Sequence, residues 1–89
     1  MKLKNRVLVI TGGASGLGQA TARYMVSEKG AKVALLDLNE AAGTATVEEL
    51  GEENAIFCQT DVTSEESIDV AIAAIMDKFG AIHMNVNAA

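Results

Sequence analysis

The segment Thr11-Gly-Gly-Ala-Ser-Gly-Leu-Gly18 constrains the fold of this chain more than any other. It follows an apolar run at 6–10 that is typical of a β-strand, and it opens a segment with the pattern of a helix. Glycine has no Cβ, so the backbone here can take positive φ and approach a ligand closely. The first turn of a helix also offers unpaired N–H groups and the positive end of the helix dipole. Strand, turn and helix together predict a site for a pyrophosphate.

The spacing of the glycines is more specific than their number. Gly12, Gly16 and Gly18 give the pattern T-G-x-x-x-G-x-G. The common fingerprint G-x-G-x-x-G is not matched, because Ala14 stands where the second glycine is required. Ser15, inside the turn, can either donate to a phosphate oxygen or stabilise the turn itself, and the sequence leaves both roles open.

Composition restricts the class of protein and its partners. The chain has 89 residues, which is enough for at most one small domain. Its net charge is −5 and it has no basic cluster, so we expect neither nucleic acid nor an anionic membrane as a partner. A single cysteine excludes an internal disulfide and a metal cluster built on thiolates, and we expect no metal site. No apolar run has the length of a membrane span or of a signal peptide, so we expect a soluble, cytoplasmic protein.

Four apolar, strand-like runs alternate with three helix-like segments. We expect strands at about 6–10, 32–37, 55–60 and 82–87, and helices at about 17–29, 40–50 and 64–79. This order with short connections predicts an α/β fold, a Rossmann-like doubly wound parallel sheet of about four strands in the order 3-2-1-4 with three helices. A ligand is then expected across the carboxyl ends of the strands, between the first and the fourth, where the glycine-rich turn lies.

Local signals mark the second and third helices. Asn39 is predicted to cap the second helix, and Thr63-Ser-Glu-Glu66 reads as a capping box for the third. The third helix is expected to pack inward through one apolar stripe, which comprises Ile68, Ile72, Ile75, Met76 and Phe79. Cys58 is interpreted as a small buried apolar residue, and His83 is not expected to take part in chemistry.

Asp37 ends the second predicted strand about 20 residues beyond Gly18, the offset at which an acidic residue meets the adenosine ribose of a dinucleotide. A carboxylate can accept from both ribose hydroxyls, and it repels a 2′-phosphate. Leu38 and Asn39, which follow, provide no cation to reverse that preference. The pattern therefore favours NAD over NADP as cofactor.

Asp61 and Val62 follow the third predicted strand and should lie at the rim of the same crevice. The carboxylate of Asp61 can accept from an adenine amino group, and Val62 can pack on the adenine ring. An Asp before Thr-Ser at a helix entrance is also common turn chemistry, so two interpretations remain for this position.

These positions together resemble the classical short-chain dehydrogenase/reductase family over the whole chain. The resemblance rests on the segment 11–18, on Asp37, on Asp61-Val62 and on Val86-Asn-Ala-Ala89, which is similar to the family's Asn-Asn-Ala-Gly segment. Within the family, the stretches 10–18, 35–38 and 61–65 are similar to type-2 3-hydroxyacyl-CoA dehydrogenases.

The resemblance implies NAD(H)-dependent hydride transfer between a secondary alcohol, such as a 3-hydroxyacyl-CoA, and its ketone. It implies that the glycines hold the pyrophosphate, that Asp37 holds the adenosine ribose, and that Asn87 lies near the inner ribose. The cofactor-binding residues implied in this way are Gly12, Ser15, Gly16, Leu17, Gly18, Asp37, Asp61, Val62 and Asn87.

The family's catalytic Ser and Tyr-x-x-x-Lys are expected beyond residue 89. We therefore expect residues 1–89 to be a partial NAD-binding domain that has no turnover of its own, and to act on a small-molecule alcohol, as a homo-oligomer, only when complete. The alternatives are a non-catalytic nucleotide-binding module and an inactive truncated gene product. The fourth strand would form an open sheet edge, so we expect marginal stability or self-association.

The fourth predicted strand departs from the family pattern at three positions. His83 stands where the family has Asp, and Ala88 where many members have a second Asn. Asn85 replaces an apolar residue. A buried amide without a partner is costly, so either Asn85 has a partner or the strand is poorly covered.

Overall fold

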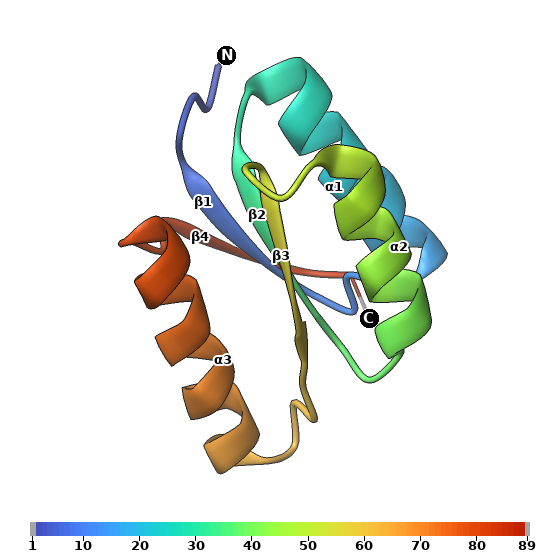
Figure 1. The fold of residues 1–89 in the computed structure, drawn as a ribbon, viewed down its shortest axis with the longest axis vertical. Helices are drawn as coiled ribbons and strands as arrows, with labels where there is room; N and C mark the ends of the chain where they lie inside the picture. Colours follow the sequence, from blue (N-terminus) through green and yellow to red (C-terminus); the bar gives the residue numbers. More distant parts are fainter. Residues whose placement is uncertain (1, 89) are drawn as a thin grey trace.

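Strands and helices alternate along residues 2–88, the part of the chain that this computed structural model describes. They are β1 (Val7–Thr11), α1 (Gly16–Lys29), β2 (Lys32–Asp37), α2 (Glu40–Leu50), β3 (Ala55–Gln59), α3 (Glu65–Phe79) and β4 (Met84–Asn87). Helices α1 and α2 lie on one side of the sheet and α3 lies on the other (Figure 1). Within the described residues, no helix combines the length and the apolar character needed to cross a membrane.

The four strands form one parallel sheet in the order β3-β2-β1-β4, which confirms the predicted order. The chain moves from β1 outward to β2 and β3, and then returns through α3 to place β4 on the other side of β1 (Figure 1). Thr11, the last residue of β1, is in register with Leu36 of β2 and Asn87 of β4. The carboxyl ends of the strands therefore meet at one edge, with the change of direction between β1 and β4.

The core consists of two clusters, one on each face of the sheet. Alternate residues of a strand point to opposite faces, so Leu8 and Ile10 enter one cluster while Val7 and Val9 enter the other. The cluster beneath α1 and α2 also contains Ala22, Ala31, Val33, Leu35, Ala55 and Ala88. The cluster beneath α3 also contains Ala34, Leu36, Ala71 and Ile75. Burial on both faces explains the continuous apolar runs of β1 and β2.

Gly43, for which the sequence suggested no role, makes room in α2 for the ring of Phe57. A Cβ at position 43 would lie 2.1 Å from Cδ1 of Phe57. Phe57 belongs to β3 and packs against the cluster beneath α1 and α2. The glycine thus allows α2 to approach β3 closely, and this benefit offsets the low helix propensity of glycine.

The expected capping box at Thr63 is wrong, because Ser64 is the N-cap of α3. The Ser64 hydroxyl accepts from the Ser67 amide at 3.2 Å. Thr63 is held one residue earlier, where its amide and its hydroxyl both donate to Oδ1 of Asp61, at 2.9 and 2.6 Å. The Asp61 carboxylate draws Thr63 into the turn before the helix and leaves the cap position to the next residue.

The predicted apolar stripe of α3 is buried only in part. Ile75 is fully buried and Phe79 packs against the same cluster, whereas Ile72 and Met76 are 41% and 44% exposed. The reason is the position of the helix, which packs mainly on β2 and β3. The flank of α3 that carries Ile72 therefore faces an open side of the sheet rather than the core.

His83 joins the start of β4 to the start of β1. Its amide donates to the Val7 carbonyl and its Nδ1 accepts from the Val7 amide, both at 2.9 Å. Val7 is only 2% exposed, so its amide depends on this imidazole for an acceptor. The side chain has a structural role in attaching β4 to the sheet.

Replacing His83 with alanine is expected to destabilise the fold by about 1–3 kcal/mol, because the buried Val7 amide loses its acceptor. The free energy of unfolding in urea measures this loss. The matched variant His83→Asp supplies a carboxylate acceptor and should recover most of the stability. Equal stability of the alanine variant and the parent chain would show that the Val7 amide does not depend on His83.

Candidate functional site

The glycine-rich turn, residues 11–18, leaves the end of β1 and passes over the end of β2. The amides of Gly12 and Gly13 both donate to the carbonyl of Leu36, at 2.8 and 3.3 Å. Gly12 has a φ of 72°, a left-handed conformation that a side chain disfavours. The turn is therefore fixed to β2 by its backbone before it enters α1.

The other glycines of the turn meet different surroundings. A Cβ on Gly18 would lie 2.2 Å from the carbonyl oxygen of Gly12, and one on Gly13 would lie 2.8 Å from Cβ of Leu35. A Cβ on Gly16 would meet nothing within 4 Å, although Gly16 is the first residue of α1 and takes a helical conformation. Packing among residues 2–88 therefore requires glycine at 13 and 18, whereas the space at Gly16 is open to a ligand.

Ser15 is the N-cap of α1 and its hydroxyl is engaged within the turn. Oγ accepts from the Gly18 amide at 3.0 Å and donates to the Gly12 carbonyl at 2.6 Å. A hydroxyl has one proton, so donation to a phosphate would replace the bond to Gly12. The structure shows the turn-stabilising role that the sequence allowed.

Two amides at the start of α1 remain available for an anion. The first N–H groups of an α-helix have no acceptor within the helix. Those of Gly18 and Gln19 donate to Ser15, but no acceptor within residues 2–88 is assigned to those of Gly16 and Leu17. They lie at the positive end of the helix dipole, beside the open space at Gly16.

Asp37, at the end of β2, lies against the glycine-rich turn. Its Oδ2 accepts from the Ala14 amide and its Oδ1 from the Asn39 amide, both at 3.0 Å. A carboxylate has about four lone-pair sites, so two backbone bonds leave about two for a ligand. The spacing of the sequence predicts the position of Asp37 but not its hydrogen bond to Ala14. Every residue except proline has a backbone amide, so the residue type does not show which amide is the donor.

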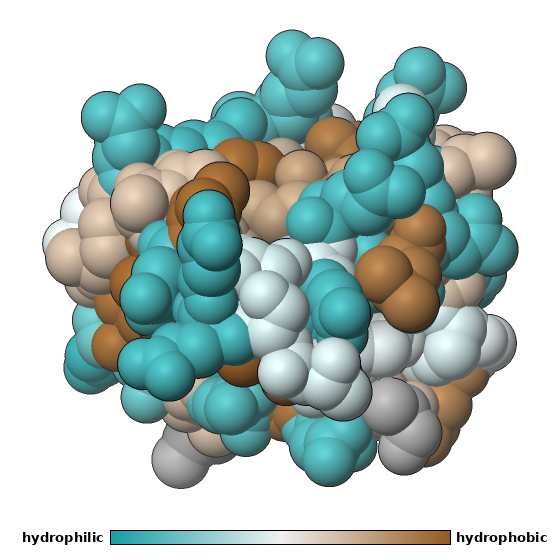
Figure 2. Space-filling model, turned by 90° about the horizontal axis from the view of Figure 1, so that it is seen from below, coloured by the Kyte–Doolittle hydropathy of each residue, from teal (hydrophilic) through white to brown (hydrophobic). Residues whose placement is uncertain are grey.

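A hollow of about 320 Å³ lies between the turn and the ends of β2 and β3. It is lined by Gly12, Ser15, Leu36, Asp37, Leu38, Thr60, Asp61, Val62 and Thr63. The volume is at the lower end of the range for small-molecule pockets. Hydrophilic residues predominate on the face seen in Figure 2, and hydrophobic residues reach the surface there in separate areas. The structure thus brings Gly12 and Ser15 of the turn together with Asp37, Asp61 and Val62 at one hollow. This hollow lies at the ends of β2 and β3 rather than between β1 and β4, and it is not lined by Gly16, Leu17, Gly18 or Asn87.

Asp61 shows the turn chemistry that the sequence left as one of two interpretations. The hydroxyl and the amide of Thr63, in that order of effect, hold the pKa of this carboxyl below its ordinary value of 3.8. The Asp61 amide donates to Oγ of Ser67 at 2.9 Å. No donor to Oδ2 lies within the described residues, so this oxygen can still accept from a ligand in the hollow.

The lowered pKa of Asp61 predicts a pH dependence of stability. The carboxylate contributes stability above about pH 4, and the contribution is lost as the pH falls through the lower pKa of the folded state. Asp61→Asn should therefore remove part of the loss of stability that occurs as the pH falls below about 4, measured by thermal unfolding at acidic pH. Thr63→Val, which removes the larger cause, should flatten the same part of the profile. Identical profiles for all three chains would contradict the assignment.

The end of β4 is attached to the other side of β1. The hydroxyl of Thr11 donates to Oδ1 of Asn87 at 3.3 Å and to the Val86 carbonyl at 3.4 Å. The Ala88 amide donates to the Thr11 carbonyl at 2.8 Å. Asn87 therefore lies at the carboxyl edge next to β1, on the side away from Asp37.

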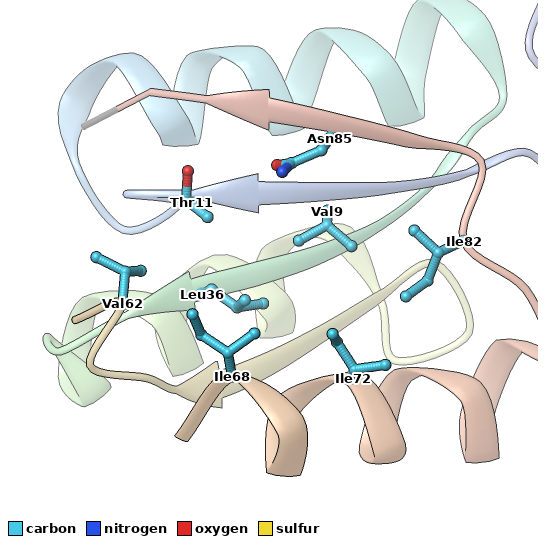
Figure 3. A pocket seen from close by; sticks show the side chains of 8 residues that line it. All are labelled: Val9, Thr11, Leu36, Val62, Ile68, Ile72, Ile82 and Asn85. Carbon is cyan, nitrogen blue, oxygen red and sulfur yellow. The ribbon is translucent and has the colours of Figure 1, made fainter. Parts of the chain in front are cut away.

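A second hollow, of about 210 Å³, lies between α3 and the open face of the sheet (Figure 3). Its lining is aliphatic apart from two polar residues, and comprises Val9, Thr11, Leu36, Val62, Ile68, Ile72, Ile82 and Asn85. Asn85 is exposed at this hollow. Of the two alternatives for Asn85, the structure thus supports a poorly covered strand.

Cys58 and Tyr24 do not join the site. Burial raises the pKa of the Cys58 thiol, whose Sγ lies 4.0 Å from the Ala71 carbonyl oxygen beneath α3, so the unreactive protonated form is favoured. Cys58 is half-buried rather than buried as expected. Tyr24 is half exposed on α1, with Nζ of Lys29 at 5.6 Å from the ring centroid.

The chain is similar to known proteins over almost its whole length. A family model described as short chain dehydrogenase matches residues 6–89. The human 3-hydroxyacyl-CoA dehydrogenase type-2 is 47% identical over 98% of this chain and 33% of its own length. The 3-beta-hydroxysteroid dehydrogenase of Comamonas testosteroni is 41% identical over 97% of this chain and 33% of its own length.

Solved structures share the architecture. The 3-ketoacyl-(acyl-carrier-protein) reductase of Brucella melitensis, crystallised with NADH, superposes with a TM-score of 0.88 at 31% identity. The match covers 94% of this chain and 34% of the reductase. The chain thus spans about a third of the length of the proteins that it matches.

Proposed function

Because this chain belongs to the short-chain dehydrogenase family, we propose that it binds NAD(H) in the hollow beside the glycine-rich turn. In this proposal residues 1–89 form the cofactor-binding part of an oxidoreductase that converts a secondary alcohol to a ketone. The observation that carries the proposal is Asp37, a carboxylate at the end of β2 that lies against the turn and lines the hollow.

The residues of the hollow, together with the start of α1 beside it, fit a dinucleotide. The open space at Gly16, beside amides of Gly16 and Leu17 that can donate to an anion, suits the pyrophosphate. The remaining lone pairs of Asp37 suit the adenosine ribose, and Oδ2 of Asp61 with the exposed Val62 suits adenine. When bound, the nicotinamide of such a cofactor supplies or accepts the hydride.

Asn87 and the β4 edge would serve the inner part of the cofactor. Asn87 of β4 is hydrogen-bonded to Thr11 at the end of β1, and β1 separates it from Asp37 on β2. A dinucleotide that crosses the carboxyl edge from β2 toward β4 would thus pass from the adenosine ribose to the inner ribose. This supports a role for Asn87 near the inner ribose.

The charge at Asp37 supports NAD rather than NADP. The carboxylate would repel a 2′-phosphate, and the neighbouring Leu38 and Asn39 offer no cation to bind one. The Asn39 amide donates to Asp37 and its side chain caps α2, so both groups are already engaged.

The proposed substrate class is a 3-hydroxyacyl-CoA, on the basis of relatives such as the human 3-hydroxyacyl-CoA dehydrogenase type-2. Residues 1–89 contain one tyrosine, Tyr24, and Glu28 stands where a Tyr-x-x-x-Lys motif needs lysine. We therefore propose that this segment binds cofactor but does not turn over substrate alone. Oxidation of hydroxyacyl-CoA by residues 1–89 would contradict this. A substrate screen should use the protein expressed from the complete reading frame that encodes the chain.

Titration with NAD and with NADP tests the cofactor assignment. Each charge-assisted bond to the ribose contributes about 1.5–3 kcal/mol, so Asp37→Ala should weaken NAD binding at least about 10-fold and reduce the preference for NAD over NADP. Asp69→Ala is the matched control, because it removes an exposed carboxylate of α3 outside the hollow. Unchanged affinities for both cofactors in the Asp37 variant would remove Asp37 from the ribose.

A further inference from the structure

We infer that Asp37 is also a positioning residue, which holds the glycine-rich turn in the shape that binds a pyrophosphate. This inference rests on the proposed function, since it takes the turn as the pyrophosphate site. This second role of Asp37 does not involve the ribose. It depends on the hydrogen bond that the Asp37 carboxylate accepts from the Ala14 amide inside the turn, at 3.0 Å.

Three consecutive amides of the turn are bound to two consecutive residues of β2. Gly12 and Gly13 donate to the Leu36 carbonyl, and Ala14 donates to Oδ2 of Asp37. The Asp37 side chain thus binds the amide that directly follows the two bound by the β2 backbone. Ala14 is 7% exposed, so little water is available to replace the carboxylate as acceptor.

The tether acts on the groups that would bind the anion. Ala14 directly precedes Ser15, the N-cap of α1, and the amides of Gly16 and Leu17 come next. A turn that is fixed at Ala14 presents these amides without a further loss of conformational freedom on binding. Without the bond, binding has to order this segment as well.

The carboxylate is the side chain that this arrangement requires. Its two oxygens accept from Ala14 and Asn39 and retain about two lone-pair sites for ribose hydroxyls. An amide in its place has one oxygen and one NH₂ group, and the NH₂ would face one of the two backbone donors. Asp37→Asn therefore disturbs the turn although it preserves size and can still bond to a ribose.

Inorganic pyrophosphate separates this role from ribose binding, because it has no ribose. If Asp37 acted through the ribose alone, removing a negative charge beside an anion site would leave pyrophosphate affinity unchanged or raise it. If Asp37 holds the turn, Asp37→Ala should lower pyrophosphate affinity by about 2- to 10-fold despite the lost repulsion. Asp69→Ala again serves as the control for charge.

Amide hydrogen exchange tests the tether without any ligand. In Asp37→Ala, the Ala14 amide should exchange about 10-fold faster than in the parent chain, relative to the Leu35 amide in the middle of β2 as an internal reference for global opening. Asp37→Asn should speed exchange at Ala14 or at Asn39, since one of the two loses its acceptor.

The outcomes distinguish the two proposals. Unchanged exchange at Ala14 together with unchanged or higher pyrophosphate affinity would overturn the positioning role, while the ribose role would still be decided by the NAD titration. A parent chain that binds neither NAD nor pyrophosphate would overturn the proposed function and, with it, the positioning of an anion site. Faster exchange together with weaker pyrophosphate binding would support the inference.

Discussion

Replacing Gly18 with alanine is expected to destabilise the fold by about 3 kcal/mol, the largest effect on stability that we predict. The new Cβ would lie 2.2 Å from the Gly12 carbonyl oxygen and 2.7 Å from Cα of Gly13. Both are backbone atoms. The amides of Gly12 and Gly13 are hydrogen-bonded to the Leu36 carbonyl, so the turn cannot move aside without losing its attachment to β2. Unfolding in urea, followed by circular dichroism, measures the loss.

Ala22→Gly is a useful comparison for this variant, because it changes α1 without introducing a clash. Ala22 is fully buried in the core beneath α1 and α2. Its replacement by glycine should cost about 1 kcal/mol from helix propensity, together with the loss of one buried methyl group. A Gly18→Ala chain that is as stable as the parent would show that the turn does not pack against the start of α1 as described.

Replacing Gly16 with alanine is expected to preserve stability and to weaken cofactor binding. Its effect on binding is the largest that we predict. No atom lies within 4 Å of the Cβ position and the residue is helical, so stability should be unchanged or rise by about 0.4–1 kcal/mol. The methyl group would occupy the space proposed for the pyrophosphate. Affinity for NAD should therefore fall at least about 10-fold, measured by calorimetric titration.

The two alanine variants form a matched pair that separates binding from folding. Gly18→Ala tests what the turn needs in order to form, and Gly16→Ala tests what it leaves open. If Gly16→Ala bound NAD as tightly as the parent chain, the pyrophosphate would not lie at Gly16. If the same variant unfolded, the open space would be an incorrect description of the turn.

The strand order and the contact of Asp37 with the glycine-rich turn follow from the sequence because they depend on patterns along the chain. The strand at 32–37 was predicted with its observed bounds, and Asn39 caps α2 as expected, through a bond to the Ala42 amide at 3.1 Å. Buried parallel strands are apolar at nearly every position, which makes them visible without knowledge of their neighbours. Their order then brings Asp37 and the glycine-rich turn to one edge.

Other features escaped prediction because they depend on contacts between distant segments. Gly43 has its role only through Phe57, a residue of another element. The N-cap of α3 is Ser64 rather than the predicted Thr63, because Thr63 is hydrogen-bonded to Asp61 in the preceding turn. The bond from Ala14 to Asp37 joins a backbone group to a side chain 23 positions away, and any residue except proline could supply that donor.

Amide chemical shifts of the ¹⁵N-labelled chain during titration with NAD report whether the glycine-rich turn binds a nicotinamide dinucleotide. We expect shifts at Gly16 and Leu17, at Asp37 and at Asp61, which report on the pyrophosphate, ribose and adenine positions respectively. A spectrum that does not respond to NAD, or shifts confined to the hollow beneath α3 around Ile68 and Ile72, would contradict binding at the turn.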